Sequence, residues 1–225
     1  MRELLSRPSK PVALPPIRVA AECIQVSNPS YPYFFMRDAG IGRVLVASLH
    51  QGIADVLPAR LGFYENWLHA EGLRDGTIGL APLYAVLSFL RQEGEPYSKI
   101  TTSAGEYAAE WTVESMGTLE RELLKRAPDA LRPRLVLRLA DRLVRSSFRS
   151  GRLVFRLRKG TATLDLRDSL FCDVREPVTH ALCGFYTAAF ARLFKLFDVP
   201  AKIQVTSCRA TGGASCAMMV TIAQT

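Results

Sequence analysis

Cysteine is the residue type in this chain that is best placed to do chemistry. Four of the five cysteines fall in the last third of the sequence, with the spacing C-x10-C-x24-C-x7-C: Cys172, Cys183, Cys208 and Cys216. Four thiolates that converge on one point give the tetrahedral, all-sulfur coordination of a structural zinc ion. The spacing is not that of a zinc finger, so free thiols that pack as small apolar groups are the alternative. Cys23 stands alone and is assigned to packing.

The elements expected around these four cysteines bring them to one end of a sheet. From Gly151 to about Leu166, apolar residues alternate with polar ones on both sides of a Lys159-Gly160 turn, which predicts a hairpin. A helix is expected over 181–197, and two further strands over 202–207 and 217–223. The first cysteine then follows the first hairpin, the second opens the helix, and the last two flank the loop of the second hairpin.

The position of Cys183 in the opening turn of a helix favours metal binding. The helix dipole lowers the pKa of a thiol at the helix N-terminus, and the thiolate is the form that binds a metal. His180 lies three residues earlier and is the reserve ligand if Cys172 points away. No cysteine–histidine pair has a context typical of nucleophilic catalysis.

Helical periodicity dominates the chain before Gly151. Helices are expected at about 39–57, around Phe63–Leu68, and at about 82–92, 104–116 and 129–148. The fold class is therefore α+β, with an N-terminal helical half packed on a C-terminal antiparallel sheet in a hairpin-helix-hairpin order. Residues 1–16 are rich in proline and are expected to form an extended arm. Residues 17–225 are expected to form a single domain, with its helical part at about 39–148 and its sheet part at about 151–225.

The helix expected over 104–116 combines small and large side chains. Ala108 is one of three alanines on it, while Tyr107 and Trp111 are large aromatic residues. Small residues allow a second helix or a flat ligand to approach closely, and aromatic rings can stack on that ligand. These three residues are candidate ligand-binding residues, and ordinary helix packing is the alternative.

The positive charge of the chain is concentrated in one segment. The net charge is +8, and the segment from Arg121 to Asp168 holds 14 basic residues against 5 acidic ones. Within the helix expected over 129–148, arginines recur every three or four residues and share a face. Arg138 and Arg142 are the candidates on this face for binding the anionic part of a ligand, and a solvated helix face is the alternative. No nucleic-acid-binding motif accompanies the charge, so no nucleic-acid partner is expected.

Neither an export signal nor a membrane-spanning segment is expected. The first ten residues are charged and lack a long apolar run, and no apolar run elsewhere approaches the roughly 20 residues that span a bilayer. A cytoplasmic location follows as an expectation, and cysteines are normally reduced there.

Two segments carry a resemblance to a known family: SLFCDVREPVTHALCGFYTAAFARLFKLF and IQVTSCRATGGASCAMMVTI. They resemble the vinyl-4-reductase domain, most of all that of the bacteriochlorophyll 4-vinyl reductase-like proteins. The similarity covers about residues 150–225, and the small-residue segment SAGEYAAEW also resembles that group. The resemblance implies a fold shared with transport-protein-particle subunits and with the sensory domains of aromatic-responsive regulators.

The resemblance also implies a homodimer that binds an apolar small molecule, with zinc beneath the ligand. By position, Cys183, Cys208 and Cys216 match the zinc cysteines of the family. The sensory domains have a glutamate three residues before the third cysteine, where this chain has Val205. Zinc would then require Cys172, which has a counterpart in the pigment-pathway branch.

Three functions are compatible with these observations. The favoured one is a binding protein for an apolar ligand, either a tetrapyrrole pigment intermediate or an aromatic compound, with structural zinc. The second is a vinyl-group reductase of (bacterio)chlorophyll synthesis, or its accessory protein. The chain has no G-x-G-x-x-G loop and no flavin motif, and hydride transfer requires a cofactor, so catalysis is not favoured. The third is a dimerising scaffold or interaction protein.

Overall fold

The structure, a computed structural model, describes residues 40–68 and 78–223. All of these residues belong to one compact unit. The extended arm expected at residues 1–16 and the isolated Cys23 lie outside the described residues. Among those described, no helix combines the length and the apolar character needed to cross a membrane.

Helices make up the part of the described chain that precedes the sheet. They are α1 (Arg43–Val56), the 3-10 turn η1 (Pro58–Arg60), α2 (Leu61–Glu65), α4 (Leu80–Gln92), α5 (Glu95–Glu114), α6 (Thr118–Lys125) and α7 (Arg132–Ser147). The sheet part follows in the order β1 (Arg152–Arg158), β2 (Thr161–Arg167), η2 (Leu170–Cys172), α8 (Gly184–Leu196), β3 (Ala201–Ser207), η3 (Arg209–Thr211) and β4 (Cys216–Ile222). The predicted α+β class and the hairpin-helix-hairpin order are confirmed.

The four strands form one antiparallel sheet with the spatial order β1-β2-β4-β3. The last strand of the chain therefore pairs with β2 as well as with its hairpin partner β3. Side chains alternate between a buried face and an exposed face, as an antiparallel sheet with one solvated side requires. On the buried face, Leu164 lies opposite Met218, and Leu166 lies opposite Cys216. The register thus places the fourth cysteine among core residues.

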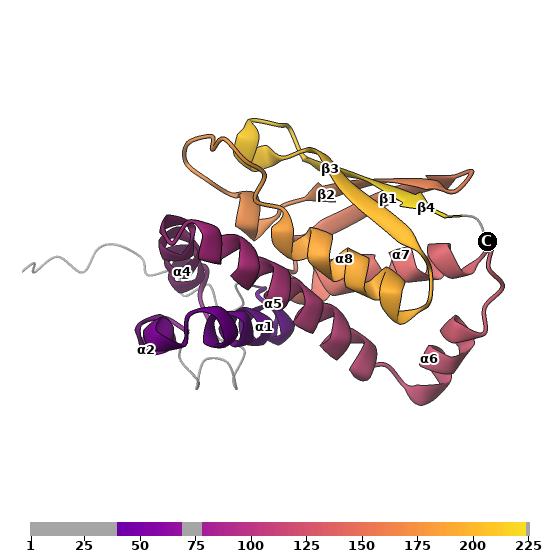
Figure 1. Ribbon diagram of the computed structural model, residues 1–225, viewed down its shortest axis with the longest axis horizontal. Coiled ribbons are helices and arrows are strands. Elements are labelled where there is room, and N and C mark those ends of the chain that lie inside the picture. The colour runs from indigo at the N-terminus through magenta and orange to yellow at the C-terminus, as the bar shows by residue number, and fades with distance from the viewer. Residues whose placement is uncertain (1–39, 69–77, 224–225) are drawn as a thin grey trace, which may run out of the picture. The chain divides into compact units, whose positions relative to one another are not determined.

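Helices cover the buried face of the sheet in successive layers (Figure 1). The helices α8 and α7 pack against the sheet and against each other, α5 packs on α8, and α1 packs on α5. The crossing helix α8 is therefore enclosed between the sheet and α5. Five aromatic residues of α8 and its C-terminal end are almost fully buried: Phe185, Tyr186, Phe190, Phe194 and Phe197.

The close approach of α5 to its two neighbours depends on glycine. A Cβ atom at Gly105 would lie 2.2 Å from the carbonyl oxygen of Phe185 in α8, and one at Gly52 of α1 would lie 2.7 Å from the carbonyl oxygen of Ile100 in α5. Ala104 and Ala108 are also fully buried on α5. The missing side chain at Gly105 therefore lets α8 pack closely against α5. Helix packing is one of the two roles that the sequence suggests for the small residues of this helix.

Three details of the helical half differ from the sequence prediction. The helix expected over 104–116 starts at Glu95, with a proline in its first turn, where the missing N–H is not needed. The helix expected from 129 begins at Arg132. Helix α6 was not predicted, because its eight residues are too few to show a repeat.

Candidate metal centre and ligand-binding residues

The four cysteines of the C-terminal third form one buried cluster. The Sγ atoms of Cys172, Cys183, Cys208 and Cys216 all lie within 4.8 Å of one another, and each residue is at most 1% exposed. Three of the separations are 3.3 Å, 3.5 Å and 3.6 Å. Four ligands at a Zn–S bond length of about 2.3 Å stand about 3.8 Å apart in a tetrahedron. The cluster therefore has nearly the dimensions of a tetrathiolate metal site.

Each cysteine is positioned by the end of an element, as expected from the sequence. Cys172 closes η2 after the first hairpin, and Cys183 is the N-cap residue of α8. Cys208 precedes η3, and Cys216 is the first residue of β4. Gly213, in the loop between the last two, cannot be replaced without a clash, because a Cβ atom there would lie 2.8 Å from the carbonyl oxygen of Cys208. The loop therefore folds back tightly onto the third cysteine.

Proximity of the thiols shifts their pKa values in opposite directions. Hydrogen bonds from Cys172 and Cys183 hold the pKa of Cys216 well below its usual range, although burial opposes this shift. The pKa of Cys183 is raised by its hydrogen bonds with Cys172 and Cys216 and by burial, so the lowering expected from its place at the helix N-terminus is outweighed. One thiolate is thus stabilised by its protonated neighbours, while further negative charge in the cluster is disfavoured. A divalent cation would supply the charge that allows the remaining thiols to ionise.

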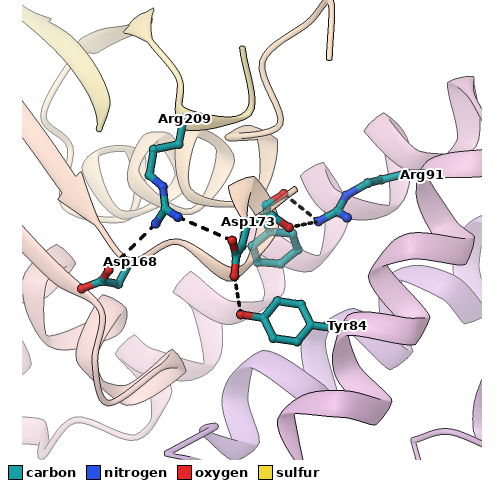
Figure 2. A network of polar contacts seen from close by, with 6 residues as sticks. Tyr84, Arg91, Asp168, Asp173 and Arg209 are labelled. Carbon is teal, nitrogen blue, oxygen red and sulfur yellow. Dashed lines mark hydrogen bonds and ion pairs between the residues drawn. The ribbon is translucent and has the colours of Figure 1, made fainter. Parts of the chain in front are cut away.

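A polar network holds the two loops that carry Cys172 and Cys208 (Figure 2). The guanidinium group of Arg209 lies 3.5 Å from a carboxylate oxygen of Asp173 and 3.9 Å from one of Asp168. Tyr84 of α4 donates a hydrogen bond of 2.7 Å to the other oxygen of Asp173. Burial and this hydrogen bond raise the pKa of Tyr84 to about 12. The network links helix α4 to the residues next to two of the cysteines.

A second contact from α4 reaches the backbone on both sides of Cys172. Arg91 donates hydrogen bonds to the carbonyl oxygens of Phe171 at 3.0 Å and Asp173 at 3.4 Å. None of these network residues is marked by a pattern in the sequence. Their spacing follows no motif, since the residues of α4 and their partners in the loops are 80 to 89 positions apart along the chain.

His180, the reserve ligand, does not join the cluster. Its side chain is exposed in the loop before α8, and it is not one of the metal-ligating groups that gather at the four thiols. Cys172 lies within the cluster. The geometry therefore favours the all-cysteine set over the set with His180.

The three candidates on α5 lie in two different environments. Ala108 is fully buried in the core. The rings of Tyr107 and Trp111 stack on each other, with centroids 5.6 Å apart, on a partly exposed side of the helix. The Tyr107 hydroxyl donates a hydrogen bond of 2.8 Å to Asp55 of α1. The aromatic pair is thus accessible to a ligand, and the alanine is not.

The two arginine candidates lie together at a groove between α6 and α7. Arg138 and Arg142 are both exposed and both line this groove, whose volume is about 340 Å³. Arg142 forms an ion pair of 3.1 Å with Glu120 of α6. Neither Tyr107 nor Trp111 lines this groove. The structure therefore brings together the members of each candidate pair but does not join the two pairs in one pocket.

Comparisons with known proteins identify the fold, but they find no sequence family. No family and no curated protein matches this sequence. Among solved structures, an H-NOX protein from S. oneidensis in the Fe(II)NO ligation state matches with a TM-score of 0.53 and 11% identity, over 82% of this chain and 100% of that chain. The Fe(II) unliganded H-NOX protein from K. algicida matches with a TM-score of 0.53 and 12% identity, over 82% of this chain and 98% of that chain. The described chain therefore has an H-NOX-like fold, and identity this low shows the fold alone.

Proposed function

We propose that this chain is a small-molecule-binding protein whose fold is stabilised by a structural zinc ion on Cys172, Cys183, Cys208 and Cys216. The observation that carries the metal part is the convergence of these four buried Sγ atoms within 4.8 Å. Zinc fits a sulfur-only donor set of this size, and four protein ligands leave no open position for water or substrate. The role of the ion is therefore stability, not catalysis.

Zinc content is the direct test of the metal part. Protein purified without chelator should contain about one zinc per chain by elemental analysis. Removing the ion should lower the melting temperature sharply, because the folded state holds the metal and the unfolded state does not. A zinc content near zero, with four thiols that react in the native state, would refute the proposal.

One cysteine variant and one histidine variant sharpen this test. Cys172→Ser should weaken zinc retention against a competing chelator, because a hydroxyl is a poor zinc ligand. His180→Ala is the matched control, and it should retain zinc like the unmodified chain, since His180 is exposed and outside the cluster. If His180→Ala loses zinc and Cys172→Ser does not, the fourth ligand has been assigned wrongly.

The ligand part of the proposal is an apolar molecule, either a tetrapyrrole pigment intermediate or an aromatic compound. Two observations support it: the resemblance of residues 150–225 to the vinyl-4-reductase domain, and the fold shared with two H-NOX proteins that are described as ferrous, one of them with NO bound. Tyr107 and Trp111 offer a partly exposed ring pair for stacking. The homodimer implied by the resemblance stays a prediction.

Absorption and fluorescence titrations test the ligand part. A dicarboxylic porphyrin and a simple aromatic such as naphthalene serve as probes. Binding should shift the absorption band of the porphyrin, or quench Trp111 in a variant in which Trp67 is replaced by phenylalanine. If neither probe changes either signal at concentrations up to its solubility, the binding function is wrong.

Ala108→Leu separates two roles of the small-residue helix. Ala108 is fully buried, so a folded variant that loses ligand binding would show that the ligand enters the helix layer. A variant that loses stability by about 1–3 kcal/mol would show ordinary core packing instead.

A further inference from the structure

The groove between α6 and α7 has an apolar floor that the described chain leaves open. Met116, Leu124 and Leu139 form part of its lining and are each less than 10% exposed. Leu135, one helical turn before Leu139, lines it as well and is only partly buried. Four apolar side chains therefore meet in a depression of about 340 Å³.

Helix α6 keeps this floor accessible because it is short and turns apolar side chains outward. It has eight residues, and Leu124 is the one that is buried. Leu123 lines the groove and is 64% exposed, and Leu119 is 73% exposed. Exposed leucines beside an apolar depression are typical of a surface that binds something, more than of an ordinary solvated helix.

The two arginines at the rim of the groove differ in whether an acidic side chain pairs with them. Arg142 is matched by Glu120, at 3.1 Å. Arg138 also lines the groove, and its side chain has no hydrogen bond or ion pair within the described part of the chain. One guanidinium group is therefore available beside an apolar floor. A guanidinium group binds a carboxylate through two parallel hydrogen bonds, which is a strong and directional contact.

We propose that this groove binds an apolar monocarboxylic acid, with its chain or ring on the leucine floor and its carboxylate on Arg138. The volume is at the lower end of the roughly 300–1,000 Å³ that small-molecule sites occupy, so a medium-chain fatty acid or a small aromatic acid fits better than a tetrapyrrole. This groove is a separate site from the Tyr107–Trp111 ring pair, so the inference goes beyond the proposed function. It does not depend on the zinc site.

Decanoic acid, kept below its aggregation concentration, is the probe, and isothermal titration calorimetry is the measurement. The acid should bind the full chain with one site. Decanol, which has the same chain and no charge, should bind at least about tenfold more weakly, because it lacks the charge-assisted hydrogen bonds. Affinity for the acid should fall as salt is added, since Arg138 is exposed.

Two arginine variants locate the site. Arg138→Gln should weaken decanoate binding by about tenfold or more and leave decanol binding unchanged. Arg134→Gln is the matched control, because Arg134 lies one turn earlier on α7, is also exposed and lines a different depression. It should bind decanoate like the unmodified chain. Equal affinity of Arg138→Gln and the unmodified chain would overturn the assignment.

A second copy of the chain is the competing occupant, and the same experiment distinguishes it. If the groove is a dimer contact, decanoate will not bind, and Leu123→Asp will convert a dimer into a monomer in light scattering. That outcome overturns the proposed acid site. The broader proposal of ligand binding would still stand if the porphyrin or naphthalene titration is positive, so the two failures are distinguishable.

Discussion

Gly105→Ala tests the closest helix contact at the centre of the fold. A Cβ atom at this position would lie 2.2 Å from the carbonyl oxygen of Phe185 and 3.0 Å from the backbone nitrogen of Ala189. Both atoms belong to the backbone of α8, so no change of rotamer can relieve the clash, and α5 and α8 must move apart. Overpacking of this kind costs about 1–3 kcal/mol, and a backbone clash belongs at the upper end, about 3 kcal/mol.

Helix propensity acts in the opposite direction. Replacing a glycine inside a helix by alanine stabilises the helix by about 1 kcal/mol. The net expectation for Gly105→Ala is therefore a free energy of unfolding lower by about 2 kcal/mol, or a melting temperature lower by about 4–8 °C for a chain of this size. Urea denaturation followed by far-UV circular dichroism measures the change.

Gly62→Ala is the matched control. A Cβ atom at Gly62, in α2, would meet no atom within 4 Å, so only the propensity term applies and stability should be unchanged or slightly higher. The reasoning is refuted if Gly105→Ala is as stable as the unmodified chain. Because Phe185 lies two residues after Cys183, Gly105→Ala should also release zinc faster to a chelator, whereas Gly62→Ala should not.

Three further changes probe the surroundings of the cysteines. The pKa of Tyr84 is raised to about 12 by burial and by its hydrogen bond to Asp173. The contribution of this hydrogen bond to the free energy of unfolding is therefore intact below the ordinary phenol pKa near 10 and is lost as the pH rises through 12. Tyr84→Phe should be less stable than the unmodified chain at pH 8, and the difference between their denaturation curves should shrink toward pH 12. Acid should release the zinc, because protons compete for the four thiolates; the melting temperature gained from zinc should be larger at pH 7.5 than at pH 5, and an equal gain would contradict thiolate ligation. Gly213→Ala places a Cβ atom 2.4 Å from the Oγ of Ser207; it should lower stability by about 1–3 kcal/mol, and unchanged urea denaturation would show that the loop adapts.

The sequence by itself determined the elements and the order of the sheet half. Alternation of apolar residues on both sides of Gly160, and helical spacing up to Leu196, follow directly from the geometry of strands and helices. The four cysteines could be predicted to lie close together, because they stand at strand and helix ends that lie at the same end of the sheet. Short or unmarked elements such as α6 could not be predicted, since eight residues hold barely two turns.

Only the tertiary structure decided which side chains share a surface. Ala108 and Trp111 are neighbours on one helix, yet one is buried and the other is partly exposed, because α5 packs against other helices on two sides. Arg142 forms an ion pair because α6 places Glu120 beside it, whereas the Arg138 side chain is left without an acidic partner among the described residues. Tyr84, Arg91 and Arg209 meet around Asp173 from distant parts of the chain, and contacts of that kind leave no local pattern in the sequence. Local spacing determines which face of an element is apolar, whereas the partner of a polar side chain depends on how distant elements pack.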